Sequence, residues 1–243
     1  MAYIGKKPTA APLTSSDVTD GIITNAKLAQ DIISADTALG AAPADTDEFL
    51  VSDAGVLKRM DYSHIKASST WTLIKTVTAS GSSSVSFIHG TSDVTFDSTY
   101  KIYCIIGQSI VAATDNQSLE VHTTNDGSSY ETSYKLSEGR TYSSGTQNAG
   151  ATSQTSGMIG GIGEFGNASG ENGSIQMWIP SPSTAGTFHT VYGMAICADD
   201  AANVRMNYFG GQHQTAEAYT GIKFSMASGN IASGTFSLYG LTT

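Results

Sequence analysis

Charged residues are scarce in this chain of 243 residues. Asp, Glu, Lys and Arg together make up 14% of it, against about 25% in an average domain. Helices usually carry Glu, Lys and Arg on their exposed faces, so this shortage argues against a helical protein. The abundant residues are instead 26 Gly, 32 Ser and 29 Thr, a composition that favours strands and turns.

Positive charge is especially rare. The chain has 12 Lys and Arg residues against 21 Asp and Glu residues, which gives a net charge of −9. Phosphate neutralisation needs a basic face, so we expect no nucleic-acid partner. No run approaches the roughly 20 apolar residues of a membrane span, and no apolar segment follows Lys6 and Lys7 as in a secretory signal. We therefore expect neither membrane insertion nor secretion.

Cysteine is limited to Cys104 and Cys197, each inside an apolar, strand-like run. This context predicts two buried free thiols rather than a disulfide. The five histidines show neither H-x-H nor H-E-x-x-H spacing, so we expect no metal site.

Motifs of catalysis and cofactor binding are missing or stand in the wrong context. Residues 161–166 match G-x-G-x-x-G, but the Asn, Ser and Gly residues that follow cannot begin the helix of a dinucleotide site. We expect a Gly-rich strand and loop there, and no cofactor. Because G-x-S-x-G is also absent, we expect no catalytic residues and no enzyme.

The chain divides into two regions of different composition. Residues 1–66 hold only three of its aromatic residues, and their apolar residues stand singly among turn formers, with one helical stretch that Asn25 could cap. We expect an extended arm there. Its strongest local signal is a β-hairpin over residues 48–60, with Gly55 in the left-handed turn position, followed by a helical turn capped by Asp61.

Residues 67–243 predict an all-β domain. Ten β-type runs recur, at 71–77, 84–88, 100–111, 118–124, 130–136, 173–179, 188–197, 204–209, 219–226 and 235–241. Asn125-Asp126-Gly127 predicts a hairpin turn between the fourth and fifth runs. Short alternating strands with such turns favour an antiparallel β-sandwich of jelly-roll type.

The polar stretch 143–156 predicts a long exposed loop. With neighbouring loops it offers hydroxyls, amides and aromatic rings and little charge, which suits a neutral glycan. The candidate receptor residues are Tyr142, Ser143, Gln147, Asn148, Gln154 and Tyr219. The alternative is that these loops are solvated caps without a ligand.

Four segments resemble the virion proteins of tailed phages, especially marine phage fibres. They are Ser228 to Leu241, Trp71 to Lys75, Asp97 to Tyr103 and Thr124 to Gly127. Upstream, Asp17 to Ala29 and Asp47 to Arg59 are similar to the N-terminal attachment arm of the same class. The resemblance implies a homotrimer with a distal jelly roll and a virion location after assembly in the bacterial cytoplasm. It supplies no catalytic residues.

The resemblance also implies that the arm binds other phage virion proteins. Its expected anchors are the apolar residues Tyr3, Ile4, Leu13, Val18, Ile22, Ile23, Leu28, Ile32 and Ile33. Tail fibre and head or capsid-decorating fibre both remain open, as does contact with a host surface glycan. The alternative from another class is a soluble carbohydrate-binding β-sandwich, which would have no need of the arm.

Overall fold

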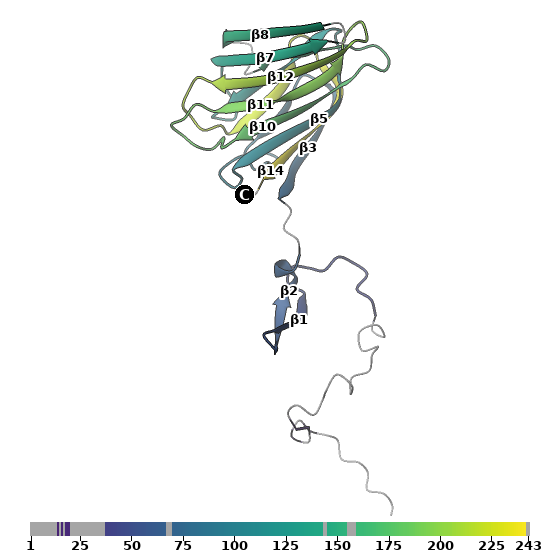
Figure 1. Cartoon of the computed structure of the whole chain (residues 1–243), viewed down its shortest axis with the longest axis vertical. Coiled ribbons are helices and arrows are strands. Elements are labelled where there is room, and N and C mark those ends of the chain that lie inside the picture. The colour runs from purple at the N-terminus through teal and green to yellow at the C-terminus, as the bar shows by residue number, and fades with distance from the viewer. Residues whose placement is uncertain are drawn as a thin grey trace, which may run out of the picture. The chain divides into compact units, whose positions relative to one another are not determined.

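The computed structural model describes residues 37–66, 70–142, 145–154 and 159–241, together with Thr14, Ser16, Val18 and Thr19. The chain divides into two units between Ser68 and Ser69, close to the expected boundary after residue 66. Figure 1 shows their different architectures. The helical stretch expected after Asn25 lies outside the described residues.

The described part of the N-terminal unit is a β-hairpin. Strands β1 (Glu48–Asp53) and β2 (Val56–Asp61) pair antiparallel. Ala54 and Gly55 form the turn with φ of 49° and 85°, so both have the positive φ that a two-residue type I′ turn requires. The predicted hairpin is thus present. A 3₁₀ turn, Tyr62–His64, follows as expected, but the Asp61 side chain makes no capping hydrogen bond.

The C-terminal unit contains two antiparallel sheets. In the larger sheet the strand order is β3 (Trp71–Ser82), β14 (Ile231–Leu241), β5 (Ile102–Ala112), β10 (Gly173–Pro180), β11 (Thr190–Ala198), β12 (Val204–His213), β7 (Tyr134–Tyr142) and β8 (Gly145–Gln154). The smaller sheet contains β4 (Val85–Ile88), β13 (Gly221–Met226), β6 (Gln117–Thr124) and β9 (Ile159–Phe165).

This strand order is that of a jelly roll. The first strand, β3, lies beside the last, β14, in one sheet, while the second, β4, lies beside the last but one, β13, in the other. β7–β8 and β11–β12 are additional pairs of strands that extend the larger sheet at one edge. The predicted fold class, an antiparallel β-sandwich of jelly-roll type, is therefore confirmed.

The core lies between the inner faces of the two sheets. Alternation is strict in β10, whose residues are buried at every second position. Phe224 of β13 and Phe236 of β14 are both fully buried, and their ring centroids lie 5.1 Å apart. This contact joins the two sheets, and burying each such ring contributes about 1.5–3 kcal/mol.

The prediction of a hairpin at Asn125-Asp126-Gly127 is wrong. The turn itself exists, because Gly127 has φ of 80° and the Asp126 carboxylate accepts hydrogen bonds from the backbone N–H groups of Ser128 and Ser129 at 2.7 Å. These bonds lower the pKa of Asp126. The flanking strands β6 and β7, however, belong to different sheets. Local turn chemistry does not determine which distant strand completes the pairing.

The expected long loop over residues 143–156 is also wrong in its central part. Residues Gly145–Gln154 form β8, which pairs with β7 from Tyr142↔Gly145 to Tyr134↔Gln154. The segment consists mainly of Gly, Ala, Thr, Gln and Asn, so it has no alternation of apolar residues to reveal a strand. Strand β9 was missed as well, although the predicted Gly-rich strand covers part of it.

The two thiols test the packing of the C-terminal unit. Cys104 and Cys197 are free and buried, as predicted, and burial raises the pKa of Cys104 to about 11 and that of Cys197 to about 12. Because the thiolate is the nucleophile, we expect neither to react with a disulfide reagent at pH 8 in the folded protein. Both should react in guanidinium chloride. Fast labelling of the native protein would contradict this packing.

Candidate functional site

Most of the expected attachment residues lie outside the described residues. These are Tyr3, Ile4, Leu13, Ile22, Ile23, Leu28, Ile32 and Ile33. Val18 is described and is 39% exposed. Attachment through these side chains stays a prediction.

The expected receptor residues do not form one group of loops. Tyr142 ends β7, while Gln147, Asn148 and Gln154 belong to the edge strand β8, and Ser143 lies outside the described residues. Tyr219 was wrongly assigned to this set. Its side chain is 1% exposed, with the ring centroid 4.8 Å from that of His189, so a receptor cannot stack on it.

An exposed apolar surface lies elsewhere, on the outward side of the larger sheet. On β11 the outward side chains Tyr192, Met194 and Ile196 are 51%, 41% and 47% exposed, and on β12 Tyr208 is 50% exposed. Register places Gln176, Met194 and Tyr208 in one row across three strands. We call the following outward residues the apolar face: Ile106, Trp178, Tyr192, Met194, Ile196, Val204, Met206 and Tyr208.

The apolar face also lacks charge. None of the outward positions on β5, β10, β11 and β12 holds Asp, Glu, Lys or Arg. The smaller sheet differs, because its outward side holds Glu120 and His122, 3.5 Å apart, and Lys223, whose Nζ lies 3.9 Å from the ring centre of Tyr130. A solvated sheet face normally carries polar residues. The smaller sheet follows that rule, and the central strands β10, β11 and β12 of the larger sheet do not.

A groove crosses the centre of the apolar face. It has a volume of about 380 Å³, and the outward side chains of Ile106, Gln176, Met194, Ile196 and Met206 line it. Tyr208 lies directly beside Met194 in the neighbouring strand. The groove is large enough for an aromatic or aliphatic side chain, and the Gln176 amide is among its few polar groups.

Three aromatic residues cluster on the same side of the sheet. The Trp71 ring lies 5.3 Å from that of Trp178 and 5.8 Å from that of Tyr239, with interplanar angles of 69° and 72°. Edge-to-face contacts stabilise such a cluster. The rings therefore do not form the flat platform on which a sugar ring stacks.

The hairpin of the N-terminal unit exposes apolar side chains too. Leu50 is 74% exposed and Leu57 is 68% exposed, and the pairing places both on the same side of the hairpin. The pairs Lys58–Asp53 and Arg59–Glu48 link its strands at the surface. Exposed ion pairs contribute about 0–1 kcal/mol, and an isolated hairpin is marginally stable. The hairpin by itself therefore has little intrinsic stability.

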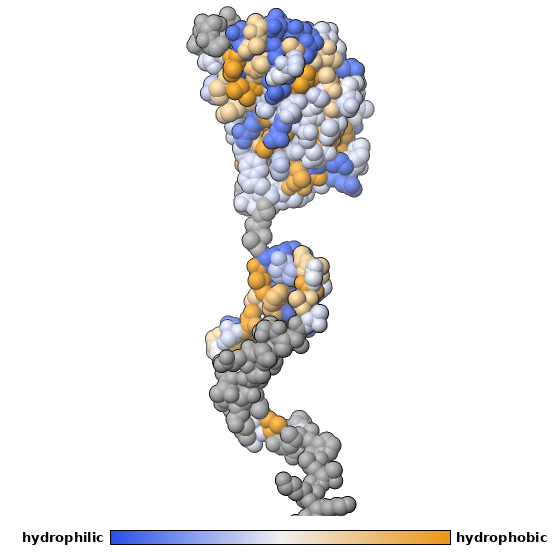
Figure 2. Space-filling model, turned by 90° about the vertical axis from the view of Figure 1, so that its right-hand side faces the viewer, coloured by the Kyte–Doolittle hydropathy of each residue, from blue (hydrophilic) through white to orange (hydrophobic). Residues whose placement is uncertain are grey.

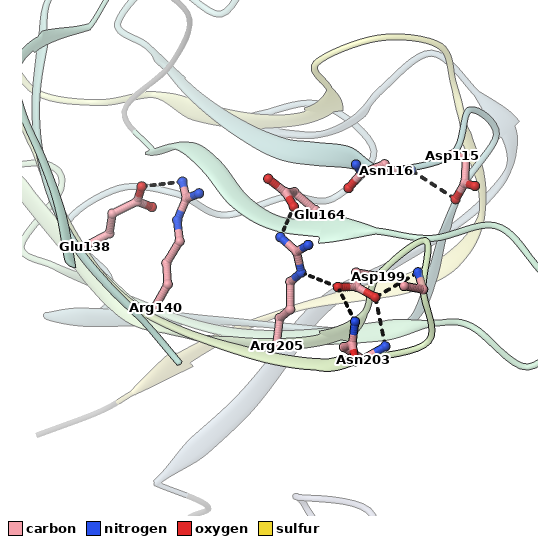
Figure 3. A network of polar contacts seen from close by, with 9 residues as sticks. Asp115, Asn116, Glu138, Arg140, Glu164, Asp199, Asn203 and Arg205 are labelled. Carbon is pink, nitrogen blue, oxygen red and sulfur yellow. Dashed lines mark hydrogen bonds and ion pairs between the residues drawn. The ribbon is translucent and has the colours of Figure 1, made fainter. Parts of the chain in front are cut away.

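Several charged side chains lie near one another between the two sheets (Figure 3). The guanidinium of Arg205 on β12 donates to Asp199 at 2.7 Å and pairs with Glu164 of β9. The other Asp199 oxygen accepts the backbone N–H groups of Ala201 and Asn203. Glu138, whose pKa is raised by burial, pairs with Arg140 at 2.5 Å. Each of these carboxylates has an Arg partner, so the network fits a structural role better than acid–base catalysis.

The chemistry of the described residues and the comparisons add no further site. Among residues 37–66, 70–142, 145–154 and 159–241, no cluster of His, Cys, Asp and Glu could hold a metal ion. No helix in that part of the chain is long and apolar enough to cross a membrane. Comparisons with protein-family models, with curated proteins and with solved structures find no match to this chain. Figure 2 shows a side of the C-terminal unit where hydrophobic atoms form small separate patches.

Most residues of the apolar face were not predicted from the sequence, although a signal was present. In Thr190–Ala198 apolar residues occupy both alternating positions, as in a strand covered on both sides. The pattern therefore indicates both a strand and a cover on its outward side.

Removing Arg205 should destabilise the C-terminal unit. In Arg205→Met, the carboxylates of Asp199 and Glu164 lose their cationic partner, so we expect the free energy of unfolding in urea to fall by about 3 kcal/mol. Adding Glu164→Leu removes one of these carboxylates and should recover part of the loss. Equal stability of the single and double variants would show that the pair is not coupled.

His122 should make stability depend on pH. Burial lowers the pKa of His122 to about 4 in the folded protein, against about 6.5 in the unfolded chain. The unfolded chain therefore binds a proton that the folded protein does not, and stability falls as pH falls from about 6.5 to about 4. We expect His122→Gln to lose up to ~3 kcal/mol less over this interval. Urea unfolding of both proteins at pH 7 and pH 4 measures the difference, and parallel losses would contradict it.

Proposed function

We propose that this protein is a structural component of a phage virion, a homotrimeric fibre anchored by its N-terminal region. The jelly roll forms the distal part, and the proposal gives it no catalytic role and no cofactor. The observation that carries the proposal is the combination of a folded jelly roll with a separate hairpin whose apolar side chains are exposed.

The hairpin supports the attachment part of the proposal. Burying Leu50 and Leu57 on a partner would contribute about 1.5–3 kcal/mol each before ordering costs. A freely soluble binding module gains nothing from such a hairpin, whereas a protein docked on a particle does. Other virion proteins are therefore the proposed partners of the N-terminal region.

Tail and head positions fit the proposal equally. Electron microscopy of virus particles purified from cultures of the source that carries this gene, labelled with an antibody to residues 70–241, tests it. We expect label on the virion, at either the tail or the capsid, and label absent from intact particles would contradict the proposal.

Weakening the hairpin should prevent assembly without unfolding the chain. We expect the double variant Leu50→Asn, Leu57→Asn to keep its circular-dichroism spectrum, because both side chains are exposed. Its copy number in purified particles should fall at least several-fold. The matched control is Ser52→Asn on the same side of the hairpin, which should assemble normally. Normal incorporation of the double variant would show that the hairpin is not part of the anchor.

The second candidate function is carbohydrate binding, for which the aromatic cluster of Trp71, Trp178 and Tyr239 is the candidate surface. Its edge-to-face geometry is unfavourable for stacking sugars. Binding of the full chain to a panel of neutral glycans, and loss of that binding in Trp178→Ala, would support carbohydrate binding. The same glycan contact could attach the protein to a host surface.

A further inference from the structure

The apolar face is the largest feature of the C-terminal unit that neither the fold nor the hairpin explains. Its side chains do not contribute to the core between the sheets, yet they form a continuous series over β10, β11 and β12. An exposed apolar surface of this kind marks an interaction site.

We propose that a neighbouring copy of this chain covers the apolar face, so that the larger sheets of the copies face one another around the axis of the oligomer. This inference rests on the homotrimer of the proposed function, and it does not depend on attachment to a virion. It assigns the subunit contact to named strands, which the resemblance to phage fibres does not.

The distribution of charge favours a second copy of the chain as the partner that covers the apolar face. Each chain carries a net charge of −9, so copies repel one another across most orientations. The outward positions of β5, β10, β11 and β12 hold no charged residue, and two copies can approach there without placing like charges together. A foreign partner selected by charge would find nothing to recognise on this surface.

The composition of the face also matches a subunit contact. Met, Tyr and Trp are enriched at the centres of protein interfaces and charged residues are depleted there. The face extends over four strands, β5, β10, β11 and β12, and about 20 Å along them, which at ~4.8 Å per strand gives on the order of 400 Å². A stable interface needs about 800 Å² from each partner, so the face supplies about half of that area and flanking residues such as Trp71 and Leu73 add to it.

The shape of the apolar face is complementary to that of a second copy. The groove lined by Ile106, Gln176 and Met194 lies beside the half-exposed ring of Tyr208. One surface thus offers both a hollow and a protruding side chain. In a symmetric oligomer each copy can place its ring against the groove of a neighbour.

The first test is the mass of the full chain in solution at micromolar concentration, measured by sedimentation. We expect an oligomer of three times the 25.2 kDa of one chain. Met194→Arg should shift the protein to a monomer with an unchanged circular-dichroism spectrum, because this side chain is 41% exposed in the single chain. The control Thr132→Arg, at an exposed loop position away from the face, should remain an oligomer.

The second test uses the unmodified protein, so it holds even if Met194→Arg does not fold. Met194 and Met60 are similarly exposed in the single chain, at 41% and 38%, and Met60 lies on the hairpin. In the oligomer we expect peroxide to oxidise Met194 several-fold more slowly than Met60, as measured by mass spectrometry. Dilution to the monomer should remove the difference.

The outcomes separate this inference from the proposed function. An oligomer in which Met194 oxidises as fast as Met60, or which Met194→Arg leaves intact, overturns the assigned face and leaves the fibre proposal standing. A wild-type monomer overturns both the face and the trimer. Failure to find the protein on particles overturns the virion role and leaves the subunit contact unaffected.

Discussion

The pairing of β14 with both β3 and β5 is the interaction on which the C-terminal unit depends. It joins residues from the two ends of the unit, Trp71 opposite Leu241, and it places Phe236 and Leu238 in the core without exposed surface. Such closure carries the entropy cost of ordering the intervening chain before the contacts form. The smaller sheet packs on this frame through Phe224, whose ring contacts that of Phe236.

The unequal size of the two sheets explains where polar groups enter the interior. Four strands cannot cover eight, and the inner sides of β7 and β12 leave the apolar core at one end, beyond Leu136 and Phe209. There Glu138, Arg140 and Arg205 replace the aliphatic residues of the central strands, and Glu164 from β9 supplies a partner. Ion pairs can be accommodated at such a margin, whereas an unpaired buried charge would be costly.

The sequence predicts the jelly roll well where one face of a strand is buried, because alternation then records the fold directly, as in Gly221–Met226. The sequence does not predict β8, because its Gly, Ala and Thr residues show no alternation of apolar and polar side chains. It also does not predict which strands pair with β7, because those strands are distant in the sequence. It also identifies exposed apolar residues poorly. Tyr219 and Tyr208 are chemically equal in the sequence, and only the register of β12 and the packing around His189 show which one is buried.

The pairing of Trp71 with Leu241 determines where a peptide can be added to the C-terminal unit. Paired residues of neighbouring strands lie about 5 Å apart, so the chain enters and leaves the sandwich at one corner (Figure 1). A peptide fused after Leu241 would emerge beside Trp71, where the first strand of the unit begins. Display at the opposite end requires insertion into a turn there, such as the one between β3 and β4, where foreign sequence interrupts no strand pairing.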